Sequence, residues 1–175
     1  MKESKVPRVL KEMRGNMYQQ KLADKVHVSR ETISKYENGR SKIPKDVSRI
    51  LNKAFDNPKF AITLQQEYTG TGPVWLDGPN VDLHRSAVKE KTDEEVSEFL
   101  EKLRKADFSK PFRAMAPYER QDTEDLLSEA VEAITSMVHF VAVTCMEGDF
   151  SYVNVWGDHY TSLKANGFLA MGGTR

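Results

Sequence analysis

Cysteine is nearly absent from this chain, whose 175 residues include only Cys145. A single cysteine cannot form an intrachain disulfide, and this rarity is typical of proteins that work in a reducing compartment. The four histidines are scattered, and no cysteine and histidine pair has the spacing of a zinc site. We therefore expect neither a metal centre nor a cofactor.

Long apolar runs are also missing. No stretch approaches the ~20 apolar residues that a membrane-spanning helix needs. The polar N-terminus, MKESKVPRVLKEM, has no hydrophobic segment of the kind found in signal peptides. We expect a cytoplasmic protein without a membrane partner, of a length that suits one or two small domains.

The chain has no net charge, because 26 lysine and arginine residues balance 26 aspartate and glutamate residues. The charges are unevenly distributed, however. Residues 1–54 carry 14 basic against 6 acidic side chains, and residues 55–175 carry 12 basic against 20 acidic ones. A basic front part joined to an acidic rear part is typical of a nucleic-acid-binding domain attached to a second module that lies away from the phosphates.

Two short helices separated by a tight turn are predicted within residues 19–39, QQKLADKVHVSRETISKYENG. Ser29 is a good N-cap for the second helix, and Gly39 can take the positive φ that ends it. Apolar residues recur at helical spacing in the first helix: Leu22, Ala23 and Val26. The second helix has few apolar residues, so its outer face is better suited to recognition than to core packing.

The segment SRETISKYENGR resembles the recognition-helix segment of the Xre/Cro/C1 family of helix-turn-helix repressors, which includes many phage and plasmid regulators. The resemblance extends over about residues 5–68. Two positions depart from the family pattern, because Tyr18 stands where many members have a Ser or Thr cap and His27 stands where many have a turn glycine. His27 can take a positive φ at some cost. The matching residues are Gln19, Leu22, Ala23, Val28, Ser29, Ile33, Tyr36, Glu37, Asn38 and Gly39.

The resemblance implies that two sets of side chains contact double-stranded DNA. The positions that face base edges are occupied by Arg30, Glu31, Thr32, Ser34 and Lys35, and those that contact phosphates by Gln19, Asn38, Arg40 and Lys42. These residue types suit the roles, because Arg and Lys donate to guanine and Glu accepts from cytosine, while cations at helix ends hold phosphates. The alternative for this segment is a helical hairpin that only packs.

The N-terminal domain, residues 1–69, is expected to be a lambda-repressor-like bundle of five helices. A helix at 4–14 precedes the two motif helices, and a fourth helix starts at Pro44. Asp56 or Asn57 is expected to cap the fifth. The predicted inward residues of the last two helices are Val47, Ile50, Leu51, Ala54, Phe60, Leu64 and Tyr68.

Residues 70–91 are expected to be a linker or docking loop. Three glycines and two prolines within residues 69–82, TGTGPVWLDGPNVD, oppose regular structure. Trp75 and Leu76 in its middle indicate that the loop packs against a domain. The loop lacks the spacing of a phosphate-binding glycine-rich motif.

The C-terminal domain, residues 92–175, is expected to be smaller and mostly helical, with one or two short strands. A capping box at residues 92–95 predicts a helix to about residue 105, with Val96, Phe99, Leu100 and Leu103 facing inward. Residues 150–156, FSYVNVW, alternate in the manner of a strand. A glycine-rich tail is expected to follow.

The longest helical pattern covers about residues 122–145 and carries a heptad-like apolar stripe. A buried strand is the alternative for its last part, residues 138–145. Proteins of this helix-turn-helix family usually dimerise to read two half-sites ~34 Å apart. Packing of the stripe within its own domain, against Phe99 and Leu103, is the alternative to dimerisation, and both can hold. The residues expected to form the dimer contact are Leu127, Val131, Ile134, Val138 and Val141.

No catalytic residues are predicted, and we expect that the chain is not an enzyme. Ser162 and Lys164 are too close together for the Ser/Lys peptidase dyad of some related repressors. His139 on an apolar face is expected to be a satisfied core histidine. A small-molecule or peptide pocket is the remaining option, and its expected lining residues are Trp75, Tyr152, Trp156 and Tyr160.

These features together predict a mainly α protein that regulates transcription by sequence-specific binding of double-stranded DNA. We expect a repressor, encoded by a bacterium or phage and associated with the nucleoid, that binds the major groove as a homodimer. The alternative is a prophage or toxin–antitoxin control protein whose acidic C-terminal half binds a partner protein or a small ligand.

Overall fold

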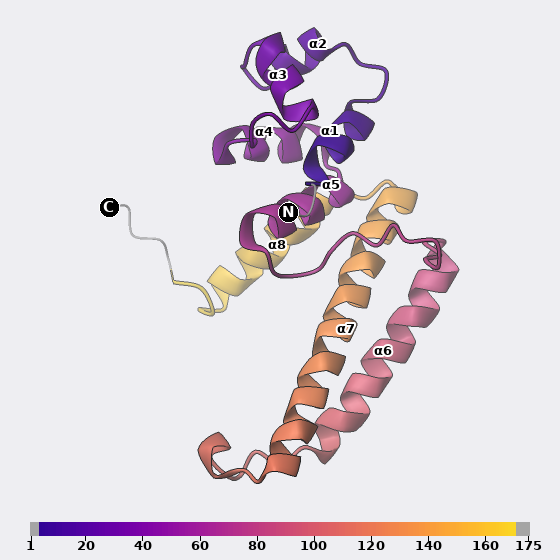
Figure 1. Ribbon diagram of the computed structural model, residues 1–175, viewed down its shortest axis with the longest axis vertical. Helices are drawn as coiled ribbons and strands as arrows, with labels where there is room; N and C mark the ends of the chain where they lie inside the picture. Colours follow the sequence, from indigo (N-terminus) through magenta and orange to yellow (C-terminus); the bar gives the residue numbers. More distant parts are fainter. Residues whose placement is uncertain (1–3, 171–175) are drawn as a thin grey trace. The chain divides into compact units, whose positions relative to one another are not determined.

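The computed structural model describes residues 4–170, and the elements of this part are helices (Figure 1). The chain forms two compact units, which we describe separately. Unit 1 contains the described residues up to Thr71 and those from Cys145 onward, and unit 2 contains Gly72–Thr144.

Five helices form the N-terminal part of unit 1: α1 (Val6–Arg14), α2 (Gln19–Lys25), α3 (Arg30–Glu37), α4 (Lys45–Phe55) and α5 (Pro58–Thr69). Their count and order agree with the prediction. All five contribute to one core, whose largest fully buried side chains are Phe60, Leu10, Leu22, Ile33, Leu51, Val9 and Val26. Because each such side chain stabilises the fold by roughly 1.5–3 kcal/mol, this core holds the short helices in place.

The junction between α4 and α5 shows which residue caps α5 and that one predicted core residue, Ala54, is not buried. Asn57 caps α5, since its side chain accepts a hydrogen bond from the Phe60 amide at 2.9 Å. Asp56 instead ends α4 in the left-handed region, with φ of 45°. The prediction that Ala54 faces the core was wrong, because Ala54 is exposed in the last turn of α4.

Unit 1 also contains α8 (Tyr152–Ala165), where the sequence analysis predicted a strand at residues 150–156. That prediction was wrong, and the described residues contain no strand. Ser151 is the physical reason, because its hydroxyl accepts from the Asn154 amide at 3.1 Å and caps a helix. The part of the expected glycine-rich tail beyond residue 170 lies outside the described residues.

Unit 2 is built on two long helices, α6 (Arg85–Lys105) and α7 (Pro117–Gly148). The residues of α7 from Cys145 onward belong to unit 1. The two helices lie side by side as an antiparallel hairpin joined by the short 3-10 helix η1 (Phe112–Ala114) (Figure 1). The strand alternative for residues 138–145 was wrong, since α7 is continuous there.

The start of α6 differs from the predicted capping box. The helix begins at Arg85, well before Thr92, and the ring of His84 accepts from the Ser86 amide at 3.4 Å. The Thr92 hydroxyl is inside the helix, where it donates to the carbonyl oxygens of Val88 at 2.7 Å and Ser136 at 3.2 Å. Thr92 therefore connects α6 to α7 instead of starting a helix.

The glycine- and proline-rich loop packs against α7 within unit 2. Trp75 is buried, and its ring lies 5.2 Å from the ring of His139. The Leu76 amide donates to His139 Nε2 at 3.1 Å, and His139 Nδ1 lies 2.8 Å from the Thr135 carbonyl oxygen. An amide can only donate, so Nε2 is the unprotonated nitrogen and Nδ1 carries the proton. His139 is thus the satisfied core histidine that was expected.

The apolar face of α7 is divided between a buried and an exposed part. The buried side chains are Leu126, Ala133, Ala142, Val143 and Cys145. The α7 stripe, defined as Leu127, Val131, Ile134, Val138 and Val141, lies entirely outside this buried set. Leu127, Val131 and Ile134 are 60%, 61% and 47% exposed, while Val138 and Val141 are half-buried.

One further expectation for unit 2 was wrong. Leu103 is exposed rather than inward, near the end of α6. By length and composition alone, α7 is also apolar enough to cross a membrane.

Candidate nucleic-acid interface

The turn between α2 and α3 is held by local backbone geometry. His27 adopts φ of 57°, so this histidine takes the positive φ that the sequence analysis allowed for it. The Val28 amide donates to the Ala23 carbonyl oxygen at 3.1 Å and closes the turn. Ser29 then caps α3, because its hydroxyl accepts from the Thr32 amide at 3.1 Å. Tyr18 precedes α2 without a side-chain capping bond and is exposed.

The two faces of α3 differ in character. Ile33 and Tyr36 are buried in the core of unit 1. The opposite face exposes Arg30, Glu31 and Lys35, which we call the recognition face. The helix is therefore fixed by its apolar side and presents ionised groups on its outer side.

Thr32 and Ser34, the other two predicted base contacts, are half-buried and already have partners. The Thr32 hydroxyl lies 3.0 Å from the Ser29 hydroxyl. Asn38 donates through Nδ2 to the Ser34 carbonyl oxygen at 2.7 Å and to its hydroxyl at 3.3 Å. These contacts stabilise the two ends of α3, and they leave the hydroxyls beside the recognition face.

The recognition face contains both signs of charge. The backbone N–H of Glu31 and the Ser29 hydroxyl hold the pKa of the Glu31 carboxyl below its ordinary value, with Arg30 and Lys35 adding to the effect. Glu31 is therefore an ionised acceptor near neutral pH. Within residues 4–170, no carboxylate forms an ion pair with Arg30 or Lys35.

The predicted phosphate contacts lie at the start of α2 and in the loop after α3. Arg40 and Lys42 are exposed in that loop, and Lys42 Nζ is 3.7 Å from Glu67 Oε1. Asn38 is the residue that ends α3. Gln19 is half-buried, and its Nε2 donates to Glu37 Oε2 at 2.7 Å.

A buried carboxylate links the helices that carry these residues. Glu37 lies at the end of α3, and Arg14 at the end of α1 contacts both of its oxygens, with Nε at 2.5 Å and Nη2 at 3.2 Å. Arg14 Nη1 also donates to the Met17 carbonyl oxygen at 2.6 Å. Together with Gln19, these contacts fix α1, α2 and α3 relative to one another.

Sequence reasoning matched Glu37 to the family pattern but gave it no structural role, and it missed Arg14. A usable signal was present. Glu37 follows Ile33 by one helical turn, so it lies on the inward face of α3. A carboxylate in that position has to be buried, and a buried charge needs a cationic partner.

Gly39 allows the chain to leave α3 close to α1. It adopts φ of 66°, a conformation that side-chain-bearing residues rarely take. A Cβ atom built on it would lie 3.4 Å from Pro7 Cγ. This turn directs Arg40 and Lys42 into the loop beside the recognition helix.

The residues of the expected ligand pocket have other local partners. Tyr152, Trp156 and Tyr160 form an aromatic row along α8, with ring centroids of neighbours 6.2 Å and 6.0 Å apart. Trp75 lies against His139 in unit 2. The described residues therefore assign each of these side chains a packing partner.

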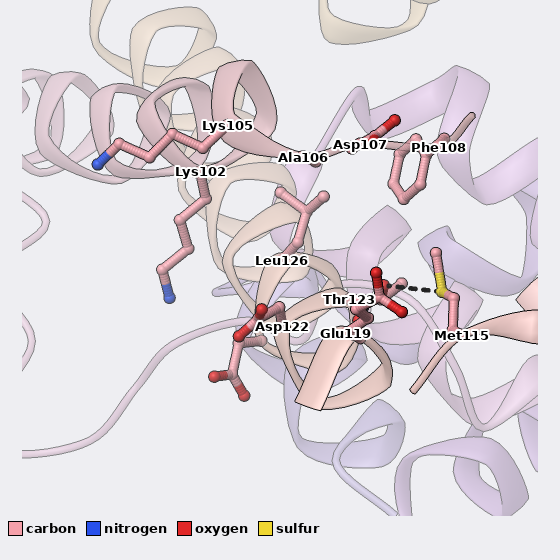
Figure 2. A pocket seen from close by; sticks show the side chains of 11 residues that line it. Lys102, Lys105, Ala106, Asp107, Phe108, Met115, Glu119, Asp122, Thr123 and Leu126 are labelled. Carbon is pink, nitrogen blue, oxygen red and sulfur yellow. Dashed lines mark hydrogen bonds between the residues drawn. The ribbon is translucent and has the colours of Figure 1, made fainter. Parts of the chain in front are cut away.

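Unit 2 has a hollow of its own where the α6–α7 hairpin turns, with a volume of about 390 Å³. Figure 2 shows the apolar Phe108, Met115 and Leu126 on its walls together with the charged Lys102 and Glu119. Glu119 Oε1 accepts a hydrogen bond from Lys110 Nζ at 2.6 Å, and Glu119 Oε2 accepts one from the Ala116 amide at 2.8 Å. These bonds fix the first turn of α7.

Comparison with known proteins supports the geometry of the first unit. Residues 10–59 match the family model described as helix-turn-helix. No curated protein and no solved structure matches the chain. The matched segment contains α2, the turn and α3 together with most of the core that holds them. Residues 10–59 therefore form a helix-turn-helix domain of the Xre/Cro/C1-like type, a DNA-binding domain of transcription regulators.

Proposed function

We propose that this protein is a transcriptional repressor that binds a specific double-stranded DNA operator as a homodimer. The observation that carries the proposal is the recognition face of α3. Arg30, Glu31 and Lys35 are exposed on a helix whose other side is fixed in the core. Such a helix can enter the major groove without rearranging.

The recognition face offers complementary groups to base edges. Arg30 and Lys35 are donors suited to guanine O6 and N7, and ionised Glu31 is an acceptor suited to the amino group of cytosine. Thr32 and Ser34 lie beside them with hydroxyls that keep spare hydrogen-bonding capacity. The preferred operator half-site should therefore contain G·C pairs.

Phosphate contacts are proposed for Gln19, Asn38, Arg40 and Lys42, at the two ends of the motif. Residues 1–54 carry a net charge of +8, which favours binding to any duplex. The affinity should fall steeply with salt, because each neutralised phosphate releases condensed counterions. Such contacts position the domain, and the bases select the sequence.

Homodimerisation is proposed through the α7 stripe. Three of its five side chains are strongly exposed in the single chain, and an apolar surface of this kind usually marks a contact site. A second copy of the chain fits this surface, because a symmetric operator is bound by two identical DNA-binding domains. Location with the DNA in the cell follows from the same proposal.

The experiment is selection of binding sites from a randomised duplex library with the full chain, followed by fluorescence anisotropy on the selected sites. We expect an inverted repeat whose half-sites are about one helical turn apart. Placing that site over a promoter should reduce transcription in vitro when the protein is added. Equal affinity for selected and scrambled duplexes would contradict the proposal.

A second candidate is a prophage or toxin–antitoxin control protein whose acidic C-terminal half binds a partner protein or small ligand. It is favoured by a cavity of about 480 Å³ in unit 2, with Leu76, Val81 and Val88 among its apolar walls. Light scattering separates the two candidates. A full chain that binds DNA but stays monomeric would favour the second.

A further inference from the structure

Three carboxylates from two helices converge inside unit 2. Glu95 is on α6, and Glu129 and Glu132 lie one turn apart on α7. One carboxylate oxygen from each can be chosen so that all three lie within 4.8 Å of one another. We call these residues the carboxylate cluster. They are brought together where the Thr92 hydroxyl binds the Ser136 carbonyl oxygen and where buried Ala133 lets the helices approach.

Two of these carboxylates keep a buried oxygen without a partner. Glu95 is only 7% exposed, and its Oε1 binds Lys91 Nζ at 2.7 Å. Glu129 Oε1 binds Lys102 Nζ at 2.6 Å. The Oε2 atoms of both residues are buried and have no hydrogen-bond partner within the described part of the chain. A buried polar atom in this condition is costly unless something outside the protein satisfies it.

The two lysines do not complete the cluster. Three carboxylates face two ammonium groups, and the lysine side chains are 58% and 45% exposed. Long exposed side chains such as these can turn into water at little cost. A trapped water molecule could satisfy the free oxygens, but it would leave the excess negative charge in place.

We propose that Glu95, Glu129 and Glu132 bind a divalent cation of the oxygen-preferring class, such as Mn²⁺ or Mg²⁺. Carboxylate oxygens are the ligands that these hard cations select. Glu132 is exposed, which gives the ion a route from solvent and leaves coordination positions for water. Mg²⁺ commonly keeps several waters and uses few protein carboxylates.

The cluster also lies beside a cavity, which gives the bound ion access to a wider space. Glu95, Glu132 and Lys91 are among the residues that line the cavity of about 480 Å³ in unit 2. An ion at the cluster would join α6 to α7 through ligands on both helices. Because it binds the folded form, it should raise the melting temperature in a concentration-dependent way.

The test is a Mn²⁺ titration of the full chain after treatment with a chelator, followed by the electron paramagnetic resonance signal of free Mn²⁺. We expect about one tightly bound Mn²⁺ per chain, displaced by excess Mg²⁺. Glu95→Gln and Glu129→Gln should each weaken binding by at least about tenfold, since even outer-shell partners of a metal contribute that much. Glu124→Gln, at an exposed position on α7, the helix that also carries Glu129, is the matched control and should bind Mn²⁺ like the parent.

Circular dichroism of each variant checks that it has folded, and Gln keeps the shape of Glu. Lys91→Gln provides a second line of proof, because removing a competing ammonium should tighten Mn²⁺ binding. The proposal is overturned if the parent binds no Mn²⁺ at millimolar concentration. It is also overturned if the control loses as much affinity as Glu95→Gln, since the binding would then be diffuse surface attraction.

Discussion

Arg14 and Glu37 are 23 positions apart in the sequence, yet the guanidinium of one contacts both carboxylate oxygens of the other. The pair lies on the inward side of α3, away from the recognition face, and the Glu37 side chain is almost entirely buried. Gln19 binds the same carboxylate. One buried acidic residue therefore fixes the two helices of the DNA-binding motif against α1.

Removal of this carboxylate should destabilise unit 1 strongly. We expect Glu37→Ala to lower the free energy of unfolding by about 3 kcal/mol, because it leaves the Arg14 guanidinium, whose side chain is only 15% exposed, without its carboxylate. Urea unfolding followed by circular dichroism measures the loss, and hydrogen exchange in α1–α3 locates it. Glu12→Ala is the control, since Glu12 pairs with Lys59 at the surface and should cost less than about 1 kcal/mol. Equal losses would contradict the role given to Glu37.

The turn after α3 should depend on glycine. Gly39→Ala places a Cβ atom at a residue with φ of 66°, which costs about 1–2 kcal/mol in the left-handed region. Gly78→Ala is a matched control, because nothing lies within 4 Å of its added Cβ, and its effect should stay within about 0.5 kcal/mol. Melting curves of both variants give the comparison. A control that melts as low as Gly39→Ala would remove the backbone explanation.

Base contacts and phosphate contacts should separate in DNA binding. We expect Arg30→Ala and Lys35→Ala each to lose about 1–3 kcal/mol of discrimination at one or two base pairs. Lys42→Ala should instead weaken binding to all sequences alike and reduce the dependence of affinity on salt. Anisotropy titrations on selected and single-substituted duplexes measure both effects. If all three variants lost affinity equally on every duplex, the recognition face would be assigned wrongly.

The α7 stripe should hold two copies together. Leu127→Glu and Ile134→Glu put like charges on a symmetric apolar contact, so each should convert the dimer to a monomer in light scattering. Val74→Glu, at an exposed position in the loop of unit 2, should leave the dimer intact. A parent chain that is monomeric and sediments with lipid vesicles would place a membrane on the stripe instead of a second copy.

The start of α7 should be sensitive to acid. The Lys110 ammonium, together with the Ala116 amide, holds the pKa of the Glu119 carboxyl below its ordinary 4.5. The stabilisation is present above the ordinary pKa, and it is lost as the pH falls through the lower pKa of the folded state. Side-chain NMR should therefore show a midpoint below 4.5 for Glu119. The stability difference between Glu119→Gln and the parent should vanish at still lower pH, and a difference that persists there would contradict this assignment.

The first unit could be predicted well because its signals are local. Ser29 caps α3 through its own hydroxyl, and Leu22, Ile33 and Leu51 are buried at the helical spacings that the sequence shows. The recognition face follows from the same spacing, since residues opposite the buried ones must face outward. The Arg14–Glu37 pair was missed because it joins residues that only the tertiary fold brings together.

The second part of the chain was harder to predict because its patterns fit two structures. Tyr152, Asn154 and Trp156 alternate with Val153 and Val155 as in a strand. Tyr152 and Trp156 also lie four apart, and their rings pack edge to face along α8. The carboxylate cluster has no sequence signature, because Glu95 and Glu129 become neighbours only when α6 and α7 pair. Residues 92–95 have the sequence pattern of a capping box, but the Thr92 hydroxyl donates to the Ser136 carbonyl oxygen across the hairpin.

The shared carboxylate of Glu37 has a consequence for genetics. Gln19 is proposed to contact a phosphate, and its side chain is oriented by a residue that solvent does not reach. A mild substitution such as Glu37→Gln would disturb that orientation in a protein that still folds. In a screen for repressor variants that no longer occupy their operator, position 37 would then be recovered alongside positions that touch DNA.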